Sequence, residues 1–157
     1  MEIENQKFYL TKEGLKEIEK EYETLKKIRH AKTNEEAPSI WESEDLNPDY
    51  LSFREDLEML ETRLAELENI LKNTVIIKKP SGEKVNFVDL GAVVDVEIDG
   101  DKDEFMIVGT LEANPILGRI SNESPVGKAL IGHKAGDEVV ISSPVKTIYK
   151  IKKIKYS

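Results

Sequence analysis

Cysteine is absent from the 157-residue sequence, and histidine occurs only at His30 and His133. The first absence excludes disulfides, thiolate metal sites and cysteine nucleophiles. The two histidines have no partners at metal-ligand spacing, so a histidine-based metal site is not expected. No apolar run approaches the roughly 18 residues of a membrane-spanning helix, and the N-terminus lacks the basic and apolar regions of a secretory signal. We therefore expect a cytoplasmic protein without a membrane partner.

Positive charge is scarce in the first half of the chain. Residues 1–74 hold 11 basic and 19 acidic side chains, whereas residues 75–157 hold 12 of each, so the first half carries the whole net charge of −8. Autonomous binding to a nucleic-acid backbone needs clustered Lys and Arg. The charge distribution argues against such binding, but it is compatible with a partner that itself handles nucleic acid.

Two heptad patterns occupy most of residues 1–74 and predict two facing helices. Thr11 is the expected N-cap of the first helix, and Pro38 interrupts the polar segment that follows that helix. The apolar positions of the two patterns are Leu15, Ile18, Tyr22, Leu25 and Ile28, then Phe53, Leu57, Leu60, Leu64, Leu67 and Leu71. An antiparallel coiled-coil hairpin satisfies both seams, places Leu25 opposite about Leu67 and reaches about 40 Å.

The turn of this hairpin is expected at residues 41–50, which hold four carboxylates and the only tryptophan. Pro48 cannot continue a helix and directs the preceding residue away from helical angles. Like charges gathered at one point repel, so an acidic tip does not stabilise the hairpin itself. The tip is either a solvated turn or a group that the hairpin delivers to a partner. Its acids are Glu42, Glu44, Asp45 and Asp49.

After Asn73 the apolar period changes from 3.5 to 2, which predicts strands. Ser124 is a suitable cap for a short helix that starts at Pro125, and a hairpin is expected around residues 99–101. The predicted strands cover residues 75–77, 92–98, 105–108, 116–121, 138–142 and 146–155. The fold class is therefore α+β, with a helical hairpin in residues 1–74 and an antiparallel β domain with one short helix in residues 75–157.

Three stretches of this pattern resemble the Gre family of bacterial transcript-cleavage factors, that is, proteins like GreA and GreB. They are Leu10–Leu15 at the start of the first helix, Asp45-Leu46 at the tip and Ser124–Gly132 in the β domain. Gly136-Asp137 and Tyr156 also fit. The resemblance implies an FKBP-like C-terminal domain that docks on bacterial RNA polymerase, with Ser124, Pro125, Gly127 and Lys128 in the docking surface.

The resemblance also implies a mechanism. The coiled coil enters the secondary channel of the polymerase, and two tip acids help to hold a second Mg²⁺ for hydrolysis of backtracked RNA. Mg²⁺ keeps several waters and needs few carboxylates, so loaned acids can complete a shared site. The protein is then an accessory factor rather than an enzyme, with no cofactor of its own. Its partners are the polymerase, the nascent RNA 3′ end and, through that complex, DNA.

The tip departs from the family pattern, which typically reads Gly-Asp-Leu-Ser/Lys-Glu-Asn-Ala-Glu-Tyr. Here residues 44–50 read Glu-Asp-Leu-Asn-Pro-Asp-Tyr, two residues shorter. Asp45 aligns with the first catalytic acid of the family, but the second has no direct counterpart, and Asp49 or Glu44 is expected to take its place. Asp45 and Asp49 are thus the expected Mg²⁺ ligands. The alternative is a Gre-like protein that binds the channel and modulates or inhibits the polymerase without stimulating cleavage.

Two further readings belong to other classes of protein. An FKBP-like domain in residues 75–157 makes prolyl-isomerase activity conceivable. Such an enzyme needs an aromatic-lined apolar pocket, however, and the few aromatic residues of this half can all be accommodated in the hydrophobic core. The other interpretation is a purely structural coiled-coil protein that forms a dimer. We expect a monomer instead, because the two seams of one chain already satisfy each other.

Overall fold

The computed structural model describes residues 6–34, 48–142 and 145–157. The chain packs into two units. One is Leu15–Asn73, and the other joins the N-terminal segment through Gly14 to Thr74–Ser157. The predicted domain boundary near residue 74 remains a prediction, but in packing the N-terminal strand belongs with the C-terminal half.

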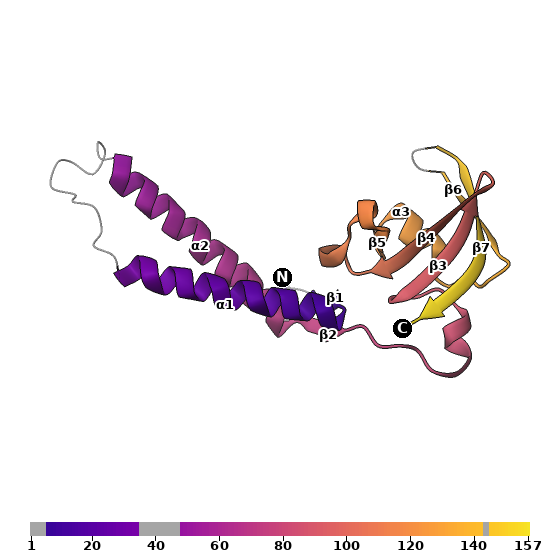
Figure 1. Ribbon diagram of the computed structural model, residues 1–157, viewed down its shortest axis with the longest axis horizontal. Coiled ribbons are helices and arrows are strands. Elements are labelled where there is room, and N and C mark those ends of the chain that lie inside the picture. Colours follow the sequence, from indigo (N-terminus) through magenta and orange to yellow (C-terminus); the bar gives the residue numbers. More distant parts are fainter. Residues whose placement is uncertain (1–5, 35–47, 143–144) are drawn as a thin grey trace, which may run out of the picture. The chain divides into compact units, whose positions relative to one another are not determined.

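The helical unit is an antiparallel hairpin (Figure 1). Its helices are α1, Lys12–Asn34, and α2, Pro48–Lys72. The Tyr22 hydroxyl donates a hydrogen bond of 2.9 Å to the Glu68 carboxylate. This contact places the middle of α1 opposite the last part of α2, in agreement with the register predicted for Leu25 and Leu67. No helix in the described part of the chain is long and apolar enough to cross a membrane.

Burial along the hairpin follows the predicted heptads only in part. Leu64 and Leu67 are buried, with exposed fractions of 2% and 0%, and Ile70, outside the predicted seam, is buried too. The facing positions of α1 are half-buried, and Ile28 is 44% exposed. Two helices that pack only on each other cover a single stripe of each surface, which explains the partial burial. The buried positions of α2 all lie toward its C-terminal end, where the seam is shielded best.

Pro48 lies in a helix rather than in the predicted turn, because α2 begins at this residue. Proline is well tolerated at the first helical position, where its missing N–H would have no intrahelical partner and its fixed φ suits a helix. Residues 48–50 therefore form the first turn of α2. The rest of the expected tip, including Trp41, Glu42, Glu44 and Asp45, lies outside the described residues.

The second unit contains a five-stranded sheet with the order β5-β4-β3-β7-β6. All neighbouring strands are antiparallel except β4 and β5. Asp99 and Gly100 form a two-residue turn between β3 and β4 with φ values of 51° and 85°, which is the pattern of a type I′ hairpin. The strands are β3, Ala92–Ile98; β4, Asp101–Val108; β5, Arg119–Ser121; β6, Glu138–Ile141; and β7, Thr147–Tyr156.

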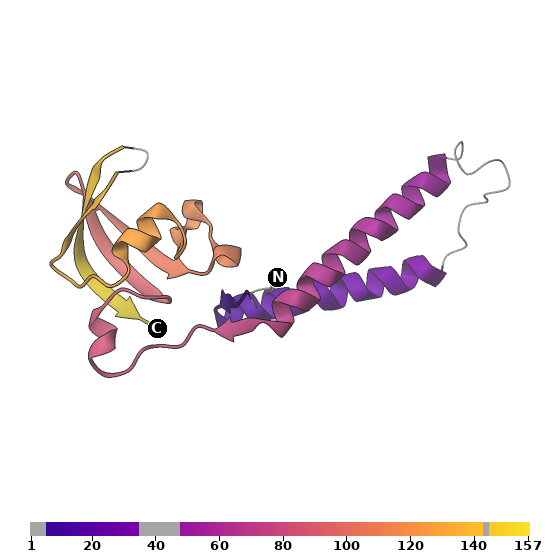
Figure 2. The same cartoon turned by 180° about the vertical axis from the view of Figure 1, so that it is seen from behind.

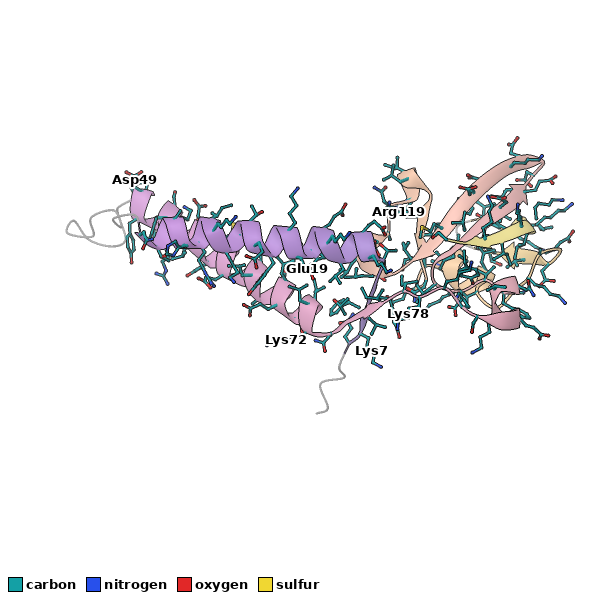
Figure 3. The ribbon with its side chains drawn as sticks, turned by 60° about the horizontal axis from the view of Figure 1, so that its bottom comes forward. Lys7, Glu19, Asp49, Lys72, Lys78 and Arg119 are labelled. Atoms are coloured by element: carbon teal, nitrogen blue, oxygen red, sulfur yellow. The ribbon has the colours of Figure 1, made fainter. Side chains whose placement is uncertain are left out.

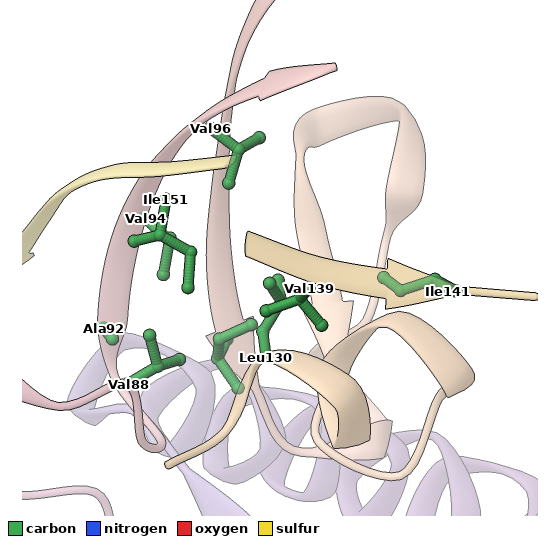
Figure 4. Packing of buried hydrophobic residues seen from close by; sticks show 9 residues of the cluster. Val88, Ala92, Val94, Val96, Leu130, Val139, Ile141 and Ile151 are labelled. Atoms are coloured by element: carbon green, nitrogen blue, oxygen red, sulfur yellow. The ribbon is translucent and has the colours of Figure 1, made fainter. Parts of the chain in front are cut away.

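Helix α3, Pro125–Leu130, covers one face of this sheet (Figure 2). Leu130 projects from α3 toward Val139 and the other apolar side chains of that face (Figure 4). The buried cluster consists of Val88, Ala92, Val94, Val96, Ile107, Leu130, Val139, Ile141 and Ile151. Alternating residues of β3 contribute Ala92, Val94 and Val96, as the period of two predicts. This core holds the C-terminal sheet together.

Two segments differ from the sequence-based expectation. The sequence pattern does not predict the strand β1, Phe8–Leu10, which pairs in parallel with β2, Thr74–Ile76. Residues 116–121 were expected to form one strand, but the 3₁₀ turn η4, Pro115–Leu117, precedes a strand of three residues. Two further 3₁₀ turns are η2, Gly82–Asn86, and η3, Thr110–Glu112.

Candidate functional site

Asp49 is the one predicted tip acid that the structure describes. It lies exposed in the first turn of α2, and Figure 3 shows it at the end of this helix opposite to Lys72. Asp49 and Lys72 are 23 residues apart in α2, so about 35 Å separates them along the helix. Asp45 and Glu44 lie outside the described residues.

Polar contacts between α1 and α2 hold the helix that carries Asp49. Arg63 donates two hydrogen bonds to the Glu21 carboxylate, of 2.8 and 3.1 Å. These bonds raise the pKa of Arg63. Nearer to Asp49, the Lys32 ammonium lies 3.5 Å from the Asp56 carboxylate and above the ring of Phe53. Exposed ion pairs contribute little individually, so these contacts fix the alignment of the two helices more than their stability.

Metal-binding capacity is limited in the described part of the chain. Among these residues, no three His, Cys, Asp or Glu side chains lie close enough together to hold an ion. Asp49 by itself offers one carboxylate, and Mg²⁺ accepts one or two protein carboxylates together with ligands from a substrate or partner.

Ser124 and Gly127, two residues predicted to bind polymerase, shape the start of α3. The Ser124 hydroxyl donates to the Ser121 carbonyl at 2.7 Å and accepts from the Gly127 N–H at 3.1 Å. Gly127 is buried, and a Cβ at this position would collide with the Ser121 carbonyl oxygen. Both residues therefore have a structural role that requires no partner.

Pro125 and Lys128, the other two predicted docking residues, are exposed on the same short helix. Pro125 occupies its first turn, and Lys128 follows one turn later. The structure thus divides the four predicted residues into a structural pair and an accessible pair. The accessible pair offers an apolar ring and an ammonium group to a partner.

A junction that the sequence did not predict joins the start of α1 to η3. The Glu112 carboxylate accepts hydrogen bonds from the Thr11 N–H at 2.8 Å and from the Thr11 hydroxyl at 2.5 Å. The same hydroxyl accepts from the Gly14 N–H at 3.1 Å, which is the predicted N-cap bond. The negative charge of Glu112 also suits a helix N-terminus. Thr11 could be read as a cap from local sequence, but no local signal points to Glu112.

Together, the described residues define a two-part protein, in which a helical hairpin carries an exposed acid and a compact sheet carries an accessible short helix. Family comparisons agree with this class. The N-terminal model of the transcription elongation factors matches residues 8–76. The C-terminal model of the transcription elongation factors GreA/GreB matches residues 76–156. The chain belongs to the GreA/GreB family of transcription elongation factors.

Individual relatives are transcription elongation factors as well. The chain is 40% identical to the transcription elongation factor GreA of Thermomicrobium roseum over 141 residues, which is 88% of this chain and 90% of the relative. It is 38% identical to that of Halalkalibacterium halodurans over 145 residues, covering 90% and 91%. Among solved structures, GreA factor homolog 1 (Gfh1) of Thermus thermophilus is 29% identical, covers 96% of this chain and 99% of its own, and superposes with a TM-score of 0.42. A TM-score this low adds nothing to the assignment, which rests on the sequence matches.

Proposed function

We propose that this protein binds bacterial RNA polymerase in the cytoplasm and stimulates cleavage of backtracked RNA. Family membership supports a role in transcription elongation. The observation that carries the finer proposal is the exposed carboxylate of Asp49 in the first turn of a long helix. A hairpin of this length can deliver an acid into a channel too narrow for the sheet unit.

In the proposed mechanism the chain lends carboxylates and does not act as an enzyme by itself. A shared Mg²⁺ in the polymerase would supply charge stabilisation for the attacking and leaving oxygens. Asp45 and Asp49 would hold that ion, with Glu44 assisting. Because Asp49 belongs to the first turn of a helix, its carbonyl can accept an i to i−4 bond that a loop residue would lack. Catalytic placement is sensitive to about 1 Å, so this rigidity favours function.

Docking is proposed for the accessible pair on α3. Lys128 supplies a charge that can meet an acidic surface, and Pro125 supplies apolar area beside it. Ser124 and Gly127 would contribute only by shaping the helix. The hairpin would enter the secondary channel and approach the 3′ end of the nascent RNA.

The deciding experiment measures RNA cleavage in a backtracked elongation complex with the cognate polymerase. Asp45→Asn and Asp49→Asn are each expected to lower the stimulated rate by about 10²-fold. Glu55→Gln is the matched control, because it removes an exposed acid from the same helix further from its start. If Asp45→Asn abolishes stimulation and Asp49→Asn does not, Glu44 rather than Asp49 would be the second acid that holds the shared Mg²⁺.

A second function is favoured by the shortened tip, which lacks the second acid of the family pattern. In this alternative the protein occupies the channel without stimulating cleavage. Binding to the polymerase would then persist in both aspartate variants, and elongation would slow in proportion to occupancy. A wild-type protein that binds but does not accelerate cleavage would establish this function in place of the first.

A further inference from the structure

A cleft of about 410 Å³ lies in the unit that contains the sheet, and none of its lining residues belongs to α3. Its walls include Lys12, Lys78 and Lys79, and its apolar lining includes Ile77, Met106 and Tyr156. Figure 3 labels Lys78 on the segment that leads away from β2. We call this feature the lysine cleft. Its volume falls within the range of about 300–1,000 Å³ that is typical of small-molecule sites.

The three lysines of the cleft are available to a ligand. Within the described residues none of them forms an ion pair, whereas Lys150, Lys152 and Lys155 are all paired across the sheet. Glu13 is the one acidic side chain in the lining. Ser157, the last residue of the chain, also lines the cleft and adds its main-chain carboxylate, so the three ammonium groups still outnumber the negative charges in the lining. Such an excess favours an anion with more than one negative charge.

The apolar side of the cleft is held in place before any ligand arrives. The Tyr156 hydroxyl donates a hydrogen bond of 2.5 Å to the Phe87 carbonyl, and burial raises the pKa of this tyrosine. Gly91 has a φ of +87°, and a Cβ there would come within 2.9 Å of Ile77. The Ile77 N–H is itself bonded to the Leu10 carbonyl at 2.9 Å. The lining is therefore fixed by main-chain contacts.

We propose that the lysine cleft binds a nucleotide. Its lysines would contact the phosphates, and its Tyr156 ring with Met106 would contact the base. Bases stack on aromatic side chains irrespective of sequence, and methionine sulfur packs favourably against rings. A simple inorganic anion would leave this apolar side unused, and a neutral aromatic molecule would leave the lysines unused. Only a ligand with both a ring and several negative charges uses the whole lining.

The test titrates the full-length protein with ATP at low ionic strength and follows binding by calorimetry and by the methyl resonances of Met106 and Ile77. Lys78→Gln and Lys79→Gln are each expected to weaken binding roughly tenfold. Glu13→Gln is expected to strengthen it several-fold, because the carboxylate repels the phosphates. Lys84→Gln, an exposed lysine outside the cleft, is the matched control and should leave the affinity unchanged. Adenosine and inorganic triphosphate should each bind more weakly than ATP.

Opposite signs for the lysine and glutamate variants, together with shifts of the Met106 and Ile77 methyl groups, would establish the site. The proposal fails if millimolar ATP moves neither signal. It also fails if Lys84→Gln weakens binding as much as Lys78→Gln, or if inorganic triphosphate binds as tightly as ATP. None of these measurements involves the polymerase, so their outcome is independent of the function proposed above.

Discussion

Glu112 accepts two hydrogen bonds from Thr11, a residue 101 positions earlier in the chain. The pair joins the start of α1 to a 3₁₀ turn beside the sheet. Gly14 completes the contact, because a Cβ at this residue would occupy the space of the Glu112 carboxylate. The lack of a Cβ atom at position 14 and the acid at position 112 therefore depend on each other.

Gly14→Ala tests this dependence, because its effect should change sign with the residue at position 112. Alanine normally stabilises a helix by about 1 kcal/mol relative to glycine. In the wild-type protein the new methyl group displaces Glu112 from Thr11, so we expect Gly14→Ala to be destabilising by about 1 kcal/mol. In a Glu112→Ala background nothing is displaced, and the same substitution should be stabilising by about 1 kcal/mol. Unfolding free energies of the four proteins form a double-mutant cycle that measures the coupling.

Hydrogen exchange supplies an independent check of the same contact. Glu112→Ala should speed exchange of the Thr11 and Gly14 amides. Glu83→Gln, which alters an exposed acid on another 3₁₀ turn, should not. Equal effects of Gly14→Ala in both backgrounds would contradict the coupling.

The contact between Thr11 and Glu112 illustrates which parts of this structure could be predicted from the sequence. Local signals identified the Thr11 cap, the two helices and the Ser124-Pro125 start of α3, because each depends on neighbours within about four residues. The Asp99-Gly100 hairpin was predicted for the same reason. Glu112 escaped prediction since its partner is remote in sequence. The parallel pairing of Phe8–Leu10 with Thr74–Ile76 was not predicted either, because the two segments are remote in sequence. In addition, the three residues of the first strand are too few to show a period.

The candidate site was predicted less completely than the fold. The sequence predicts Pro48 in a turn, but proline at the first position of a helix has the same local signature, and α2 begins at this residue. The family resemblance predicts the four docking residues only as a group. The sequence could not distinguish the buried Gly127 from the exposed Lys128, because this distinction depends on the contact of Gly127 with Ser121.

Leu67 is the best buried position of the hairpin, with an exposed fraction of 0%. Leu67→Ala is expected to destabilise the helical unit by about 3 kcal/mol, from lost transfer energy and the remaining cavity. Leu51→Ala, at a position that is 40% exposed on the same helix, should cost under about 1 kcal/mol. Thermal melts followed by circular dichroism at 222 nm would separate the two. Similar melting temperatures for both variants would mean that the hairpin seam contributes little.

Asp137 gives the β domain a contribution to stability that depends on pH. Its pKa is lowered from the usual 3.8, first by the hydrogen bond from the Lys134 N–H and then by His133. A depressed pKa in the folded state stabilises the protein above the unfolded-state pKa, and the contribution is lost as the pH falls through the folded-state pKa. Asp137→Asn should therefore lower the melting temperature at pH 6. The difference should shrink steadily below pH 3.8.

Two controls accompany the Asp137 measurement. Asp101→Asn, at an exposed position on β4, should show no such convergence with the wild type in acid. Raising the salt concentration should weaken only the His133 part of the effect, because the backbone hydrogen bond is short and local. A constant difference between Asp137→Asn and wild type from pH 6 to pH 2 would assign the effect to shape rather than charge.

The division of the predicted docking residues leads to the last prediction. Ser124→Ala removes a helix cap and should cost about 1 kcal/mol of stability. Gly127→Ala forces a methyl group against the Ser121 carbonyl and should cost about 1–3 kcal/mol. Lys128→Glu should leave the unfolding free energy within about 0.5 kcal/mol, because its side chain lies on the surface.

Binding to the polymerase should follow the opposite order. Lys128→Glu reverses a charge in the proposed interface and should weaken binding by about tenfold or more. Ser124→Ala should weaken binding only as far as α3 loosens, so the loss should be recovered at lower temperature. Equilibrium binding of the four proteins to core polymerase, measured beside their unfolding curves, separates the two roles. If Ser124→Ala abolishes binding at a temperature where α3 is intact, the serine hydroxyl itself contacts the polymerase, and the division into a structural and an accessible pair is wrong.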